Sequence, residues 1–175
     1  MICDTPNPVS NFDGARYMGT WYTASHSRGM PFQLDRWSCT TAMYGDLEAD
    51  GAFKLYNSSE TKYHVGPRFG VHGTAVTTSD AGSVAVSIGA HSDAPNYFVV
   101  DTDYENYSIV YNCSQKYTNI TELWYLTRNP VATQAELEKY ERIARAALPN
   151  FNFDLMLVDQ QGAKCRYATS PYLTL

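Results

Sequence analysis

The 175-residue sequence lacks the features that mark several large classes of protein. It has no apolar run near the ~20 residues that a membrane-spanning helix needs. Its formal net charge is −5 and it has no basic cluster, which argues against a nucleic-acid partner. It contains no C-x-x-C pair of the kind that holds zinc, so we expect no metal. These absences favour a protein with neither a transmembrane segment nor a nucleic-acid partner.

Sequence motifs of common hydrolases are also missing. Neither G-x-S-x-G nor H-E-x-x-H occurs, and the four histidines are scattered along the chain. A nucleophile and its base are not recognisable, so we do not expect an enzyme.

Cysteine is scarce but informative. The four cysteines are widely spaced: Cys3, Cys39, Cys113 and Cys165. This spacing indicates two disulfides, for which the sequence alone allows three pairings. Four N-x-[ST] triplets also fit a glycoprotein of the secretory pathway. No signal peptide is visible, and Met1 directly before Ile2-Cys3 indicates a start residue added to a mature, secreted sequence.

Strand-forming segments follow one another from Thr20 to Arg128 in a chain that is rich in tyrosine (14 residues). The expected strands are Thr20–Ser27, Ser38–Leu47, Phe53–Ser58, Tyr63–Thr77, Val84–Ala90, Tyr97–Asp101, Tyr107–Cys113 and Glu122–Arg128. Short clusters of Gly, Asp, Ser, Asn and Pro separate most of them, as in hairpins. Eight such strands predict an all-β domain spanning residues 1–175, either an up-and-down antiparallel barrel or a sandwich. The apolar connection Gly29–Trp37 could be a lid or a cluster on the outer wall.

One helix is expected near the C-terminus. Thr133 and Glu136 form a capping box, apolar residues follow at helical spacing, and Pro149 ends the run. Its apolar face should pack against the outside of the strands. Leu155–Val158 predicts one further strand.

Three separated motifs resemble the lipocalin family, and most closely its apolipoprotein D-like branch. The first is Asn11-Phe12-Asp13 leading into Gly19-Thr20-Trp21-Tyr22. The second is Thr102–Tyr107 running into Ile109–Cys113, and the third is Arg128-Asn129-Pro130. The resemblance covers nearly the whole chain and implies an eight-stranded barrel with the helix packed outside.

The resemblance also implies a closed end and a disulfide pattern. Arg128 would lie over the Trp21 ring, a cation–π contact worth about 0.5–2 kcal/mol. The expected floor of the barrel comprises Gly19, Trp21, Thr102, Asp103, Tyr104 and Arg128. The implied disulfides are Cys3–Cys113 and Cys39–Cys165, and the chain-entropy model gives each about 4–5 kcal/mol as an upper figure.

Strand alternation and the family match together predict the residues that face inward. With Trp21 inward, Thr23 and Ser25 also face inward and His26 faces outward. The predicted ligand-binding wall is Ala42, Tyr44, Leu55, Asn57, Phe69, Val71, Val86, Tyr97, Val99, Ser108, Val110, Asn112, Glu122, Trp124 and Leu126. A barrel filled by its own side chains would use many of the same residues, but small ones such as Ala42 and Ser108 favour a cavity. Because Asn57 and Asn112 would face inward and Asn106 lies in a tight turn, Asn119 is the expected glycosylation site.

The family implies an extracellular carrier of a hydrophobic or amphipathic small molecule. The aromatic wall favours a pigment, either a bilin such as biliverdin or a carotenoid, and the alternative is a colourless lipid, steroid or retinoid. Lys54, Lys62, His64 and Arg68 could face a carboxylate at the mouth, although a solvated rim is the favoured interpretation. A lipocalin enzyme, a protein-interaction module and a homo-oligomer are the other hypotheses, of which oligomerisation is compatible with carrying a pigment.

Overall fold

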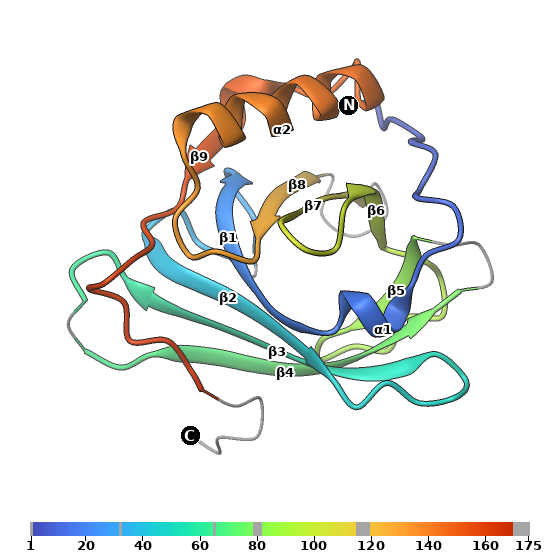
Figure 1. Cartoon of the computed structure of the whole chain (residues 1–175), viewed down its shortest axis with the longest axis horizontal. Coiled ribbons are helices and arrows are strands. Elements are labelled where there is room, and N and C mark those ends of the chain that lie inside the picture. Colours follow the sequence, from blue (N-terminus) through green and yellow to red (C-terminus); the bar gives the residue numbers. More distant parts are fainter. Residues whose placement is uncertain (1, 32, 65, 79–81, 115–119, 170–175) are drawn as a thin grey trace.

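The computed structural model describes residues 2–31, 33–64, 66–78, 82–114 and 120–169. Eight antiparallel strands form the barrel (Figure 1): β1 Gly19–Ser27, β2 Trp37–Gly45, β3 Ala52–Thr61, β4 Phe69–Thr77, β5 Ser83–Ser87, β6 Tyr97–Thr102, β7 Tyr107–Ser114 and β8 Ile120–Thr127. Each pairs with the next in sequence, and β1 pairs with both β2 and β8, which closes the ring. The predicted up-and-down barrel is confirmed, and the sandwich is excluded.

The strands β4 and β5 are shorter than expected because the backbone turns early. β4 begins at Phe69 rather than Tyr63, since His64 (φ 54°) and Gly66 (φ 86°) adopt left-handed conformations that a strand cannot hold. β5 ends at Ser87, just before Gly89 (φ 76°). Both turns lie at the same end of the barrel.

The two larger clusters of buried apolar side chains lie on opposite faces of the strands. One cluster fills the base of the barrel and includes Trp21, Val99 and Val110, each 0% exposed. The other lies outside β7 and β8, where Ile109 and Leu123 pack beneath the helix α2 (Gln134–Ala147). This separation is the period-2 alternation expected of strands.

Helix α2 packs outside the barrel as predicted (Figure 1). Its capping box is present, with Thr133 Oγ1 accepting from the Glu136 amide and Glu136 accepting from the Thr133 amide. Tyr140, Ala144 and Leu148 are its buried anchors. The strand β9 (Met156–Val158) then pairs with the C-terminal end of β1, residues Ser25 to Ser27.

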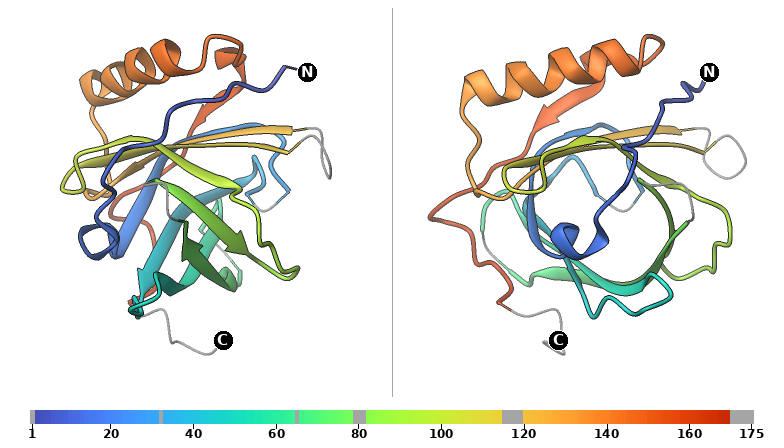
Figure 2. Two further views of the ribbon diagram at one scale, coloured as in Figure 1. Left: turned by 90° about the vertical axis from the view of Figure 1, so that its right-hand side faces the viewer. Right: turned by 45° about the vertical axis from the view of Figure 1, so that its right-hand side comes forward.

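The short helix α1 (Gly14–Tyr17) lies across one end of the ring, in the right-hand view of Figure 2. The Arg128 guanidinium carbon is 3.7 Å from the centroid of the Trp21 ring. The same guanidinium donates to the carbonyls of Arg16, Tyr17, Met18, Thr20 and Tyr104. Gly19 (φ 100°) lets the backbone pass beneath it, where an added Cβ would lie 3.2 Å from Arg128 Nη1.

The turn between β6 and β7 is built by Thr102 and Asp103. Asp103 Oδ1 accepts hydrogen bonds from the amides of residues 105, 106 and 107. Burial alone would raise the pKa of Asp103, but these bonds and the one from the Asn106 side chain hold it below its ordinary value. The turn thereby presents the Tyr104 carbonyl to Arg128, which links the second motif to the third.

Two disulfides tie the chain ends to the barrel. They join Cys3 to Cys113 and Cys39 to Cys165, as the resemblance implied. Across the described residues, no helix combines the length and apolar character that crossing a membrane requires.

Replacing Trp21 with Ala should lower the free energy of unfolding by about 3–5 kcal/mol, because it empties a fully buried aromatic site. Trp37→Ala is the matched control, since Trp37 lies at the other end of the barrel and is only half-buried. Urea unfolding of both variants measures the difference. Equal losses of unfolding free energy in the two variants would show that Trp21 contributes no more to stability than Trp37.

Asp159, next to β9, should make stability depend on pH. It is 5% exposed, and burial raises its pKa to about 7 despite hydrogen bonds from Thr40. Because the pKa of this carboxyl is raised in the folded state, its contribution to stability is fully present below the ordinary pKa of about 4. The contribution is lost as pH rises through about 7, and the free energy of unfolding falls by up to ~1.4 kcal/mol per pH unit.

Asp159→Asn should remove this part of the pH dependence and be relatively more stable at neutral pH. Urea unfolding at a series of pH values tests it, with the exposed Asp154→Asn as control. Parallel pH profiles for wild type and Asp159→Asn would contradict the assignment.

Candidate ligand-binding site

The base of the barrel interior is closed by a cluster of hydroxyl groups. Tyr17 rises from α1 and is 1% exposed. Its hydroxyl lies 2.8 Å from both Tyr97 Oη and Ser108 Oγ, and Tyr97 Oη is 3.1 Å from Tyr44 Oη. These four side chains join α1 to three strands through one hydrogen-bond network.

Burial keeps this cluster neutral. It raises the pKa of Tyr44 to about 12, and it raises the pKa of Tyr17 and of Tyr97 well above the ordinary value of 10. Each hydroxyl can therefore donate one bond and accept others. The cluster carries no charge that a ligand would have to neutralise.

Part of the predicted wall lies in this filled base. The residues concerned are at most 8% exposed: Ala42, Tyr44, Leu55, Val99, Ser108, Val110 and Leu126. They face inward, but they pack on one another, on Tyr17 or on Trp21. Their contact with a ligand stays a prediction.

The rest of the predicted wall lies in the half of the barrel away from α1, which we call the open half. Tyr97 belongs to both halves, because its ring lies in the open half and its hydroxyl reaches Tyr17 in the base. The register places these side chains on the inner face: Asn57, Phe69, Val71, Val86, Tyr97, Asn112, Glu122 and Trp124. All except Glu122 keep part of their surface exposed. A side chain that points into a completely filled barrel would be fully covered, so these exposed inward-facing surfaces are the ones that a ligand in the open half would contact.

Two pairs of aromatic rings line the open half of the barrel. Tyr97 and Trp124 are stacked with centroids 6.5 Å apart, and Trp37 stacks on Phe69 at 5.0 Å. Such faces suit a flat, apolar or conjugated molecule. Trp37 was not among the predicted site residues because it precedes the predicted second strand.

Three polar side chains of the predicted wall lie on the inner face of the open half. Asn112 Nδ2 donates to Glu122 Oε2 at 2.6 Å. Burial raises the pKa of Glu122, and the bond from Asn112 opposes that shift. Asn57 Oδ1 is buried and has no hydrogen-bond partner among the residues that the structure describes.

The predicted directions of Ser25 and His26 are wrong. The register between β1 and β8 shifts between Thr23 and Ser25, a bulge that reverses the alternation beyond it. His26 therefore lies opposite Trp124 on the inner face and is 2% exposed, whereas Ser25 donates to the Leu157 carbonyl of β9. Period-2 reasoning cannot detect one extra residue in a strand.

Gln33 is a further inner residue that the sequence did not reveal. It belongs to the β1–β2 connection, yet it is 6% exposed. Its Nε2 lies 3.0 Å from His26 Nδ1, and its Oε1 accepts from Trp124 Nε1 at 3.2 Å. Part of the predicted lid is thus hydrogen-bonded to the barrel wall.

The profile of the Lipocalin / cytosolic fatty-acid binding protein family matches residues 18–154. The chain belongs to the lipocalin family. Its curated relatives place this lipocalin in the apolipoprotein D-like branch. It is 28% identical over 158 residues to Lazarillo protein of Schistocerca americana, with 89% of this chain and 72% of that protein covered. It is 28% identical over 130 residues to apolipoprotein D of Bos taurus, with 73% and 67% covered.

Solved structures share the lipocalin barrel. Insecticyanin from the tobacco hornworm Manduca sexta has a TM-score of 0.73 at 20% identity, covering 91% of this chain and 86% of its own. Lobster apocrustacyanin A1 has a TM-score of 0.70 at 17% identity, covering 95% and 96%. At these identities the likeness shows the fold alone. As a lipocalin, the chain has the fold of a carrier for small hydrophobic ligands, and its two disulfides fit an extracellular compartment.

The four charged residues considered as a carboxylate site at the mouth of this lipocalin do not gather there. Lys54 pairs with Asp46 in the β2–β3 hairpin at the closed end, 3.1 Å away. Arg68 instead donates to the Arg166 carbonyl of the C-terminal segment. The hypothesis of a four-residue carboxylate site is therefore wrong.

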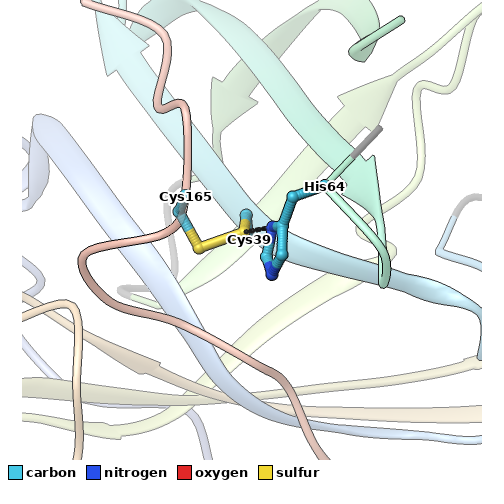
Figure 3. A group of neighbouring side chains, drawn as sticks. All are labelled: Cys39, His64 and Cys165. Carbon is cyan, nitrogen blue, oxygen red and sulfur yellow. Dashed lines mark hydrogen bonds between the residues drawn. A yellow bond between two sulfur atoms is a disulfide. The ribbon is translucent and has the colours of Figure 1, made fainter. Parts of the chain in front are cut away.

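One cluster of potential metal ligands occurs among the described residues (Figure 3). The Sγ atoms of Cys39 and Cys165 and a ring nitrogen of His64 lie within 4.8 Å of one another. The two sulfurs are joined in a disulfide, and a metal site would need them as thiolates. In its oxidised form this cluster is a structural disulfide capped by a histidine.

Two of the N-x-[ST] asparagines face the barrel interior, namely Asn57 and Asn112. Asn106 is exposed and donates through its side chain to Asp103. Asn119, the expected glycosylation site, lies outside the described residues.

Gln33→Leu should lower the free energy of unfolding by about 1–3 kcal/mol, because it leaves Trp124 Nε1 and His26 Nδ1 without their partner. Gln134→Leu, on the exposed face of α2, is the control and should change stability by less than about 0.5 kcal/mol. Denaturant unfolding followed by tryptophan fluorescence checks both. Indistinguishable variants would show that Gln33 does not join the loop to the wall.

Proposed function

We propose that this lipocalin is a secreted carrier that holds one long, apolar, conjugated molecule in the open half of its barrel, namely a bilin such as biliverdin or a carotenoid. The observation that carries the proposal is the exposure of inward-facing side chains above a sealed base. Pockets of this kind, mostly apolar with few polar groups, are typical of small-molecule sites. An eight-stranded barrel has room for one small ligand.

The aromatic pairs favour a flat pigment over a saturated lipid. Tyr97–Trp124 and Trp37–Phe69 offer ring faces to a conjugated chain or ring. The aliphatic side chains of Val71 and Val86 would cover its edges. The resemblance to the apolipoprotein D-like branch includes pigment carriers as well as carriers of fatty acids and steroids.

Mass spectrometry of an organic extract of the protein from its natural source tests the proposal directly. A bound bilin or carotenoid, with visible absorbance before extraction, is the expected result. A colourless protein that yields only lipid, steroid or retinoid would contradict the assignment of a pigment ligand and support the carrier function. An extract without any small molecule would overturn both.

Trp124→Ala should weaken the binding of biliverdin or of a carotenoid by about tenfold or more, since it removes one large face of the site. Tyr22→Ala is the control, because Tyr22 packs against Tyr167 on the outer surface. Equilibrium ultrafiltration with each pigment measures the affinities. Unchanged affinity in Trp124→Ala would place the ligand elsewhere.

A further inference from the structure

The hydrogen bonds around Gln33 determine which nitrogen of His26 carries a proton. An indole N–H can only donate, so the Gln33 atom facing Trp124 Nε1 must be the carbonyl oxygen. The Gln33 amide nitrogen then faces His26 Nδ1, and an amide NH₂ can only donate. His26 Nδ1 is therefore an acceptor, and its proton is on Nε2.

The ring is also neutral. Burial lowers the pKa of His26 to about 4, although the nearby carboxylate of Asp35 opposes that shift. A neutral imidazole carries one N–H, and the chain of bonds from Trp124 assigns it to Nε2. The interior of the barrel thus contains a histidine held as a single tautomer.

His26 Nε2–H has no hydrogen-bond partner among the described residues. The side chain is 2% exposed and lies on the inner face, opposite Trp124. A buried donor without a partner is costly, and such groups are rare unless water or a ligand completes them. This buried, unpaired donor on the inner face is therefore a candidate contact for a polar atom of a ligand.

Glu122 limits the kind of acceptor that fits. It lies two residues from Trp124 on β8, on the same inner face, and is 8% exposed. A carboxylate guest would be buried near a second carboxyl group, and burial disfavours the charged form of both. A neutral carbonyl oxygen accepts from the His26 N–H without that cost.

We propose that His26 Nε2–H anchors a neutral carbonyl oxygen of the ligand, the ketone of a carotenoid ring or the lactam of a bilin. The inference rests on the proposed carrier function and adds to it the position and chemistry of one end of the ligand. Gln33 is a positioning residue, because it holds the tautomer without itself supplying the donor.

Canthaxanthin and β-carotene provide a matched pair of probes, because they share a skeleton and differ in two ketone oxygens. Wild type should bind canthaxanthin about tenfold more tightly, the factor that one buried hydrogen bond supplies. His26→Phe should abolish this preference without weakening β-carotene binding, and His26→Gln, which restores an N–H, should recover part of it. His72→Phe, an exposed histidine on β4, is the control.

The outcomes separate this inference from the carrier function. If wild type binds both carotenoids equally and His26→Phe changes neither affinity, His26 does not bind the ligand carbonyl. Water would then be the hydrogen-bond partner of His26, and the proposed carrier function would be unaffected. If wild type retains neither carotenoid nor biliverdin, both proposals fail. A loss with biliverdin in His26→Phe assigns the lactam, and a loss confined to canthaxanthin assigns the ketone. An equal loss with palmitate would overturn the neutral carbonyl in favour of a carboxylate.

Nitrogen-15 NMR of the wild-type histidine rings gives a readout that does not depend on folding of a variant. The expected spectrum shows His26 neutral and protonated at Nε2, with that proton shifted on addition of canthaxanthin. A ring protonated at Nδ1 would overturn the proposal.

Discussion

The guanidinium of Arg128 lies over the Trp21 ring and donates to carbonyl groups of α1, β1 and the β6–β7 turn. It therefore supplies hydrogen bonds to backbone oxygens at the point where three segments meet. A lysine could not do the same, because its ammonium group has three donors and no planar face to stack. The closed end of the barrel depends on this one side chain.

Closing one end of the barrel leaves the other end as the place where a ligand can bind. Tyr17 reaches the barrel interior only because α1 is held across the base, and its hydroxyl organises Tyr97, Ser108 and, through Tyr97, Tyr44. These groups satisfy one another and present no unpaired polar atom. Among the described residues of the inner face, the unpaired buried atoms belong to His26 and Asn57, which lie above that network.

The fold could be predicted because its determinants are local or lie in fixed motifs. Trp21, the Thr102–Tyr104 turn and Arg128 identify the family, and the capping box identifies α2. The site was only partly predictable, because alternation assigns a face only while the register is regular. The bulge between Thr23 and Ser25 turns the His26 side chain from the outer to the inner face. Gln33 reaches the interior from a loop, whose path cannot be predicted from sequence periodicity.

Selectivity in such a barrel must come from the few polar atoms that a ligand alone can satisfy. Apolar walls distinguish ligands weakly, whereas a buried group left unpaired by the wrong ligand costs much more. Gln33 connects this effect to the β1–β2 loop, since the oxygen that accepts from Trp124 also directs its amide toward His26. A movement of that loop would change the hydrogen-bonding character of the interior as well as access to it. The loop and the site therefore act as one unit.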